Sequence, residues 1–106
     1  MKMVRLSSRD WSHEPVMEAR GFFEHLLGLR SLGPGKALLL ERSSVHSIGI
    51  PTTFRAIGLS DDYVVMDVKT LRPWSIVSFR GCRHVLELPI DMDPPAVGSR
   101  LEVSSV

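Results

Sequence analysis

Basic and aromatic side chains suited to ligand recognition fall into three short segments of the chain. Arg20 belongs to an apolar N-terminal segment, His46 lies in a strand-like segment, and Arg72 and Trp74 flank a proline. A guanidinium group donates paired hydrogen bonds to a carboxylate or phosphate, and an indole face suits a cation or a planar group. These residues predict a binding site for a small anionic or planar ligand. The alternative is structural: Arg20 pairs with Glu87 or another acid, and Trp74 covers the core.

Metal, cofactor and phosphate-loop chemistry have little support in the sequence. The four histidines lack the spacing of a zinc site on a helix or a strand. The segment Gly33-Pro34-Gly35-Lys36 contains glycines and a lysine, but it lacks the Ser or Thr that follows the lysine of a phosphate-binding loop. We therefore expect no metal and no cofactor.

Cysteine chemistry is restricted because Cys82 is the one cysteine of the chain. It excludes an internal disulfide, a four-thiolate zinc site and a CxxC redox pair. Arg80 and Arg83 flank it, and positive charge beside a thiol lowers its pKa. A cysteine at the entrance to a strand is more often a small buried filler, and we favour that interpretation over covalent catalysis.

Two functions from different classes fit these residues. The leading hypothesis is a non-enzymatic β module that binds a small, anionic ligand or a protein partner, because no acid–base pair lies at a recognisable spacing. The alternative is a small hydrolase or transferase that uses His46 with Arg20 and Arg72 as anion clamps. A His46 side chain within reach of an acid or a ligand would favour the enzyme, whereas a His46 packed under aliphatic side chains would exclude it.

The composition indicates one small domain spanning residues 1–106. Its 106 residues are 43% hydrophobic and 24% charged, which suits a globular core. Thirteen basic and twelve acidic side chains leave a net charge of +1, so nucleic acid and membrane surfaces are not expected partners. No apolar run approaches the roughly 20 residues of a membrane span, and the N-terminus lacks the pattern of a secretory signal. We expect a cytoplasmic protein, monomeric or weakly dimeric through an exposed sheet edge.

A helix and a series of strands would position the candidate residues. An apolar stripe predicts one helix within residues 12–30, with Ser12 as its N-cap. The stripe consists of Val16, Ala19, Phe23, Leu26 and Leu27. Beyond residue 36, short aliphatic and β-branched segments alternate with turns, and Ser60-Asp61-Asp62-Tyr63 predicts a hairpin. The expected strands lie near residues 2–6, 37–42, 44–50, 54–59, 63–69, 75–80, 83–88 and 99–104.

The predicted fold class is therefore mainly β, a small antiparallel β-sandwich or barrel with one short N-terminal α-helix. The same periodicities predict which side chains are buried. They are Val16, Phe23, Leu26, Leu38, Leu40, Ile57, Val64, Met66, Leu86, Leu88 and Leu101.

Four local motifs, in a fixed order, resemble those of a known protein family. They are Ala19-Arg20-Gly21-Phe22-Phe23, Val45-His46-Ser47-Ile48-Gly49-Ile50, Leu71-Arg72-Pro73-Trp74, and Val85-Leu86-Glu87-Leu88-Pro89 followed by Gly98 and Leu101-Glu102-Val103. From about Ala19 to Val103 the chain resembles the small bacterial and archaeal family called domain of unknown function 192. The resemblance implies a mostly β fold with a short helix, and it brings no settled activity.

The chain departs from this family pattern at two carboxylates. Arg55 stands where the family usually has an aspartate, and Ser99 stands where it has a second one. A proline-rich link also replaces a helical stretch before Gly98. Functions that require those two carboxylates are therefore not expected of this chain.

Overall fold

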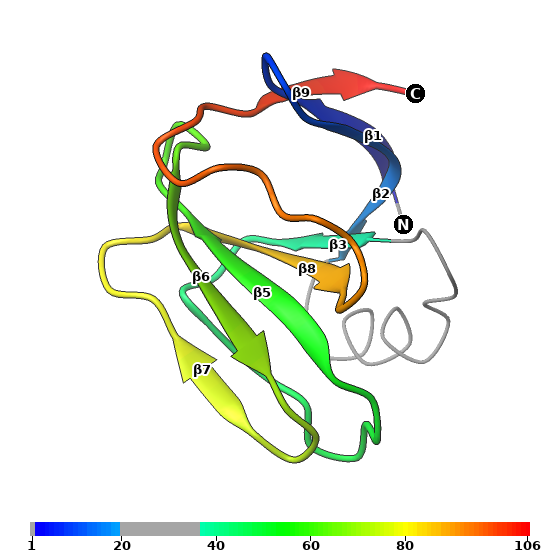
Figure 1. The fold of residues 1–106 in the computed structure, drawn as a ribbon, viewed down its shortest axis with the longest axis vertical. Coiled ribbons are helices and arrows are strands. Elements are labelled where there is room, and N and C mark those ends of the chain that lie inside the picture. The colour runs from blue at the N-terminus through cyan, green and yellow to red at the C-terminus, as the bar shows by residue number, and fades with distance from the viewer. Residues whose placement is uncertain (1, 20–36) are drawn as a thin grey trace.

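The computed structural model describes residues 2–19 and 37–106, and every regular element in these ranges is a β-strand (Figure 1). The strands are β1 (Lys2–Ser7), β2 (Ser12–Ala19), β3 (Ala37–Leu40), β4 (Ser44–His46), β5 (Phe54–Leu59), β6 (Val65–Leu71), β7 (Ile76–Ser78), β8 (His84–Pro89) and β9 (Glu102–Ser105). The prediction of a mainly β protein is confirmed. Within the described ranges, no helix is long and apolar enough to cross a membrane.

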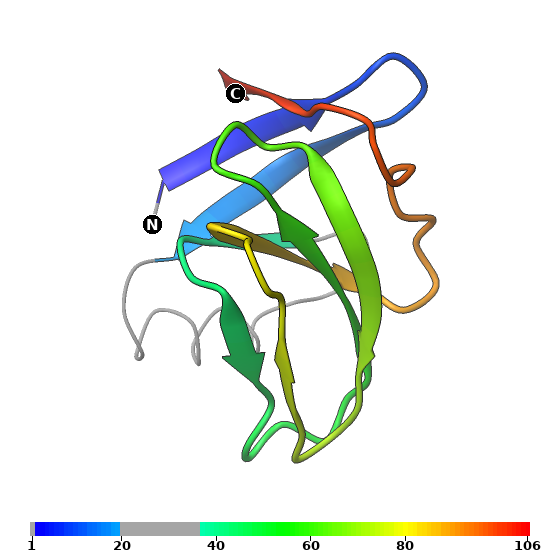
Figure 2. The same ribbon diagram turned by 90° about the vertical axis from the view of Figure 1, so that its left-hand side faces the viewer.

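The strands form two sheets. Seven of them pair in the order β6-β5-β8-β3-β2-β1-β9, and β4 pairs with β7 in a separate two-stranded sheet. The large sheet bends, so that β1, β2 and β9 cross β5 and β6 at an angle (Figure 2). An isolated bridge between Val64 and Arg100 connects its two outer regions. The expected antiparallel pairing holds for every strand pair except β2 and β3, which are parallel.

The prediction of a helix within residues 12–30 is wrong for residues 12–19, because these residues form β2. This strand pairs with β1 on one side and with β3 on the other, so its backbone groups are satisfied by the sheet. Pro15 lacks an N–H, but it lies where the pairing with β1 shifts register between Val4 and Leu6, and the ladder does not need its donor there. The remainder of the predicted helix lies outside the described residues.

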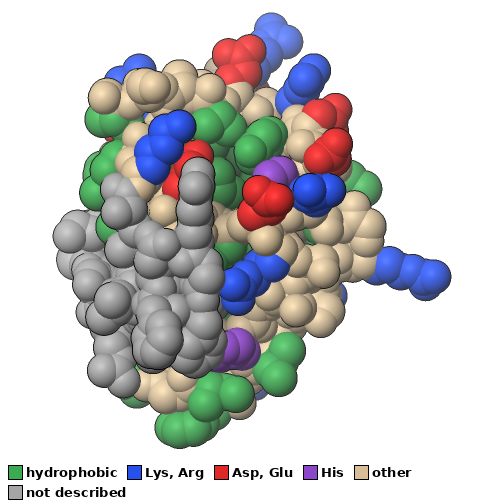
Figure 3. Space-filling model, turned by 180° about the vertical axis from the view of Figure 1, so that it is seen from behind, with side chains coloured by type: hydrophobic (Ala, Val, Ile, Leu, Met, Phe, Trp, Pro, Cys, Tyr) green, Lys and Arg blue, Asp and Glu red, His purple; other side chains and the backbone are tan. Residues whose placement is uncertain are grey.

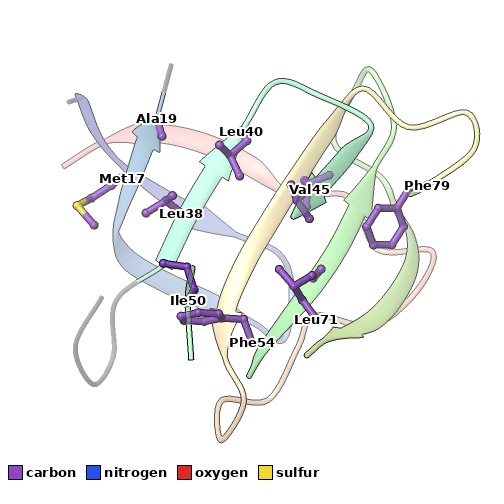
Figure 4. Packing of buried hydrophobic residues seen from close by; sticks show 11 residues of the cluster. Met17, Ala19, Leu38, Leu40, Val45, Ile50, Phe54, Leu71 and Phe79 are labelled. Atoms are coloured by element: carbon purple, nitrogen blue, oxygen red, sulfur yellow. The ribbon is translucent and has the colours of Figure 1, made fainter. Parts of the chain in front are cut away.

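The central strands of the large sheet, β5, β8 and β3, are buried on both faces. One cluster packs between the large sheet and the small sheet (Figure 4) and comprises Met17, Ala19, Leu38, Leu40, Val45, Ile50, Phe54, Ala56, Leu71, Phe79 and Val85. The other comprises Val4, Leu6, Val16, Ala37, Leu39, Ile57, Leu59, Val65, Leu86, Leu88 and Leu101. Strands β3 and β8 contribute to both clusters, which is why their burial is continuous instead of alternating.

Most of the predicted core is confirmed within the described residues, with an error of register in β6. The confirmed side chains are Val16, Leu38, Leu40, Ile57, Leu86, Leu88 and Leu101. Met66 is 49% exposed and Val64 is half-buried, whereas the intervening Val65 is buried. The pairing of β5 with β6 shifts register between Gly58 and Leu59, and a shift of one residue exchanges the two faces of a strand. Phe23 and Leu26 lie outside the described residues.

The predicted hairpin turn is confirmed between β5 and β6. The amide of Tyr63 donates to the carbonyl of Ser60 at 3.0 Å, and the Ser60 hydroxyl donates to Asp62 Oδ1 at 2.6 Å. The Ser60 hydroxyl also accepts a hydrogen bond from the amide of Val64 at 3.0 Å. This turn fixes where Tyr63 emerges from the sheet.

Candidate functional site

Three of the four predicted site residues lie at one end of the two-stranded sheet. His46 is the last residue of β4 and pairs with Ile76 of β7. Arg72 and Trp74 lie in the connection from β6 to β7, and both are exposed, whereas His46 is half-buried. Arg20 lies outside the described residues, so its suggested pairing with Glu87 stays a prediction. Glu87 itself is fully buried on β8.

A buried serine joins the two loops that carry these residues. Ser47 has no exposed surface, and its hydroxyl donates to the carbonyl of Arg72 and accepts from the amide of Ser75 at 3.0 Å. Its backbone amide donates to the carbonyl of Ser75 at 2.9 Å, and its carbonyl accepts from the amide of Trp74 at 3.3 Å. Because an unsatisfied buried hydroxyl is unfavourable, these bonds fix the two loops against each other. Sequence reasoning did not single out Ser47.

Trp74 has an unusual backbone conformation. Its φ of 56° lies in the left-handed region, which a bulky side chain rarely adopts and which often marks functional sites. The residue is 68% exposed, so the alternative that Trp74 covers the core is wrong. Ile48 and Ile76 are also exposed, at 48% and 67%. Residues 46–50 and 72–76 together are termed the Trp74 end.

The His46 ring accepts a long hydrogen bond at Nδ1 from the amide of Ile48, at 3.4 Å. An imidazole that accepts at one nitrogen carries its proton on the other when it is neutral. Among the described residues, no group of three or more His, Cys, Asp or Glu side chains is arranged to hold a metal ion. The Trp74 end offers an indole face and a guanidinium group.

A second candidate site, which the sequence did not indicate, is a hollow of about 440 Å³ at the edge of the large sheet. It is lined by Glu18, Ala19, Leu39, Glu41, Tyr63 and His84, and it is termed the His84 hollow. His84 is 8% exposed and stacks on Tyr63, with ring centroids 4.3 Å apart and planes inclined by 14°.

Strand register brings the lining residues of this hollow together. The parallel pairing of β2 with β3 places Ala19 opposite Leu40, so Glu18 and Glu41 lie near the same edge of the sheet. Strand β8 begins at His84, which pairs with Leu59 at the end of β5. Tyr63 follows β5 through the hairpin turn, and its φ of 66° directs the chain out of that turn. Four strand ends thus meet at one place.

Three carboxylates act on Tyr63 in the His84 hollow. The pKa of Tyr63 is raised, first by burial and then by the charges of Glu18, Glu41 and Asp61, since each of these disfavours tyrosinate. Arg83 offsets part of this charge by pairing with Glu41 at 3.4 Å, on side chains that are both mostly exposed. The half-buried Glu18 makes no ion pair within the described ranges.

Cys82 behaves as a packed side chain and not as an activated thiol. Burial raises its pKa, Asp67 raises it further, and Lys69 opposes them, so the pKa is not lowered as an activated thiol flanked by Arg80 and Arg83 would require. A Cβ added at Gly58 would lie 2.9 Å from its sulfur and 2.5 Å from Cδ1 of Phe79. The cysteine therefore fills space beside β5.

Two solved structures share this fold. A crystal structure of a putative transcription regulator from Sinorhizobium meliloti 1021 matches with a TM-score of 0.71, over 97% of this chain and 96% of that chain, at 20% identity. A protein of unknown function from Novosphingobium aromaticivorans DSM 12444 matches with a TM-score of 0.71, over 94% of this chain and 83% of that chain, at 19% identity. No protein-family model and no curated protein matches the chain. At these identities the comparison shows a common fold.

Proposed function

We propose that the chain is a non-enzymatic binding module of the domain of unknown function 192 type, which recognises an anionic group at the Trp74 end. The group belongs to a small ligand or to a protein partner. The observation that carries this proposal is the exposed Trp74, held in a left-handed backbone conformation on a loop that the buried Ser47 fixes. Strain of this kind persists where the surrounding structure imposes it.

The composition of the Trp74 end supports recognition. Tryptophan and arginine are the side chains most enriched at binding hot spots, and Trp74 and Arg72 are two residues apart on one loop. Ile48 and Ile76 supply apolar area beside them. Two of the four motifs of the family resemblance, residues 45–50 and 71–74, meet here through Ser47. The two residues that stand in place of the family's carboxylates make hydrogen bonds to the backbone. Arg55 donates to the carbonyl of Ile90, and Ser99 donates to the carbonyl of Ala96.

A ligand or a protein partner suits this surface better than DNA. The chain carries a net charge of +1. On the described part of the face shown in Figure 3, acidic and basic side chains are interspersed. Phosphate backbones are bound by clustered positive charge. The neighbour described as a putative transcription regulator is compatible with a regulatory role that is exercised through such recognition.

An NMR titration with benzoate and inorganic phosphate tests the proposal. The indole N–H signal of Trp74 should shift, whereas that of Trp11 serves as an internal control because its Nε1 donates to the carbonyl of Asp93 at 2.9 Å. Arg72→Ala should weaken binding about tenfold or more, since charge-assisted hydrogen bonds contribute roughly 1.5–3 kcal/mol. Arg80→Ala removes an exposed arginine outside the Trp74 end and should leave binding unchanged. A Trp74 signal that ignores both probes at millimolar concentration would contradict the proposal.

A further inference from the structure

We propose that the free edge of β9 pairs with the same edge of a second copy of this chain, as two antiparallel strands related by a two-fold axis. The occupant is a second copy because the open backbone groups of β9 form a self-complementary set in one register. This edge shares no residue with the Trp74 end, so the two proposals are tested independently.

The first observation is that β9 ends the large sheet. It pairs with β1 on one side, and the described part of the chain places no strand on its other side. All four of its residues are exposed, and it lies along the top of the molecule in Figure 1. An edge strand of this kind presents N–H and C=O groups with which a second chain can pair.

The pairing of β1 shows which groups of β9 are already used. Successive residues of an antiparallel strand direct their N–H and C=O groups to alternate sides. The amide of Ser8 donates to the carbonyl of Trp11 at 2.6 Å, on the side of β2, so the groups of Ser7 point to β9. Ser7 pairs with Glu102. Strand β9 therefore bonds to β1 through Glu102 and, two residues later, through Ser104.

The backbone groups of Val103 and Ser105 consequently point to the open side. Leu101 follows the same alternation, but its amide already donates to the carbonyl of Tyr63 at 2.9 Å. The open edge of β9 thus offers two residues to a partner, Val103 and Ser105.

These two residues define one two-fold register. With Ser104 on the axis, Val103 of each copy lies opposite Ser105 of the other, and each such pair exchanges two N–H···O bonds. A two-fold axis normal to the sheet keeps equivalent side chains on the same face, as the pleat requires. Glu102 then lies opposite Val106, so no like charges face each other directly.

The surroundings of β9 also suit an added strand. Val103 pairs with the buried Leu6 and lies on the same face, yet it is 37% exposed. A second β9 would cover it and extend this apolar face across the interface. A hollow of about 620 Å³ lies between the hairpin turn at residues 61–63 and the start of β9, which leaves room for the incoming strand.

The other strand edges within the described ranges are protected. Strand β6, at the opposite end of the large sheet, carries Asp67 and Lys69, and Lys69 Nζ donates to the carbonyl of Ser78 on β7 at 2.6 Å. Strands β4 and β7 have three residues each, and short or charged edges resist pairing. Strand β9 has no lysine or proline, and its pairing with β1 has no shift of register.

Sedimentation equilibrium over a range of protein concentrations tests the proposal. The edge is four residues long, so we expect a weak dimer with a dissociation constant of about 0.1–1 mM. Hydrogen exchange at low and high protein concentration gives a second readout. The amides of Val103 and Ser105 should gain protection as the dimer forms, whereas the amide of Ser104, which points to β1, should not change.

Charge substitutions on the axis test the register. Ser104→Lys and Ser104→Glu each place two like charges opposite each other, so each should weaken the dimer about tenfold or more. An equal mixture of the two variants should associate again, because unlike charges then meet. Ser44→Lys makes the same change at an exposed position of β4 and should leave association unchanged. Matching circular dichroism spectra confirm that each variant is folded.

Ser105→Pro tests the hydrogen bonds themselves. The substitution removes an N–H that points to the open side, so the pairing with β1 is kept while the dimer weakens about tenfold or more. Should this variant fail to fold, the two Ser104 variants and their mixture decide.

Each outcome decides the proposal. Association that is lost in both Ser104 variants and restored in their mixture supports it. Association that survives Ser104→Lys, or an equal loss in Ser44→Lys, would overturn it. A native chain that stays monomeric at about 2 mM would also overturn it, including the case in which β9 instead takes up a strand of an unrelated protein. Benzoate and phosphate titrations of Trp74 report on the other proposal separately.

Discussion

The Trp74 end and the His84 hollow position their functional groups in opposite ways. At the Trp74 end the Arg72 and Trp74 side chains are exposed, and a single buried hydroxyl, that of Ser47, fixes the loops that carry them. In the His84 hollow the imidazole is buried, and the register of β2, β3, β5 and β8 brings the lining residues together. The first arrangement depends on one local set of hydrogen bonds and the second on the whole sheet.

This difference determines how each region should respond to change. A substitution in the core of the large sheet should disturb the His84 hollow together with global stability. Loss of the Ser47 hydroxyl should disturb the Trp74 end while the large sheet stays intact, because β4 and β7 pair with each other and not with that sheet. Four predictions, from the largest expected effect to the smallest, test this distinction.

Leu86→Ala should lower the free energy of unfolding by about 2–5 kcal/mol. Leu86 is fully buried in the strand that begins at His84, and it pairs with Leu39 and Ile57. Denaturant titration measures the loss. Ile76→Ala, at a position 67% exposed on β7, should change stability by less than about 0.5 kcal/mol. Equal midpoints for the two variants would contradict the assignment of the large sheet as the main core.

Gly58→Ala should destabilise the protein by about 1–3 kcal/mol through overpacking. The added Cβ would lie 2.5 Å from Cδ1 of Phe79, a buried side chain that follows β7 and packs against the large sheet. Combining it with Phe79→Leu should recover part of the loss in a double-mutant cycle. Strictly additive losses would show that the two residues do not press on each other.

Ser47→Ala should cost about 1 kcal/mol, the net contribution of a typical intramolecular hydrogen bond. Its more specific consequence is local: the indole signal of Trp74 should move toward that of a free side chain, while the His84 signals keep their positions. Heteronuclear NMR of the variant measures both. A His84 signal that moves as far as that of Trp74 would show that the two regions are coupled.

The smallest effect concerns pH. The pKa of Tyr63 is raised above its ordinary value of 10.0, so its protonated form stabilises the folded state. That contribution is complete below about pH 10 and is lost as the pH rises through the folded-state pKa. Because Tyr63 is the one tyrosine, tyrosinate absorbance follows it directly. Glu18→Gln should bring its titration toward pH 10; a native protein that titrates at or below pH 10 would contradict the effect of burial and of these carboxylates on Tyr63.

The sequence was sufficient where the signals are local. The strands after residue 36 lie close to their predicted ranges, and the Ser60 turn forms as its side chains indicate. The segments with His46 and with Arg72 and Trp74 also lie together, although the sequence did not reveal Ser47 as the link. Turn residues and short apolar segments act over a few positions, so a linear pattern records them.

The tertiary structure alone decided what depends on pairing between distant segments. Residues 12–19 have spacings that fit a helix, but β1 and β3 pair with both sides of this segment and make it a strand. A shift of register, not composition, buries Val65 in place of Val64 and Met66. The His84 hollow joins residues from four strand ends that share no motif. Sequence by itself determined a mainly β protein with an indole and a guanidinium group on one loop; long-range strand register determined the second site, because the pairing partners of a strand lie outside its own sequence.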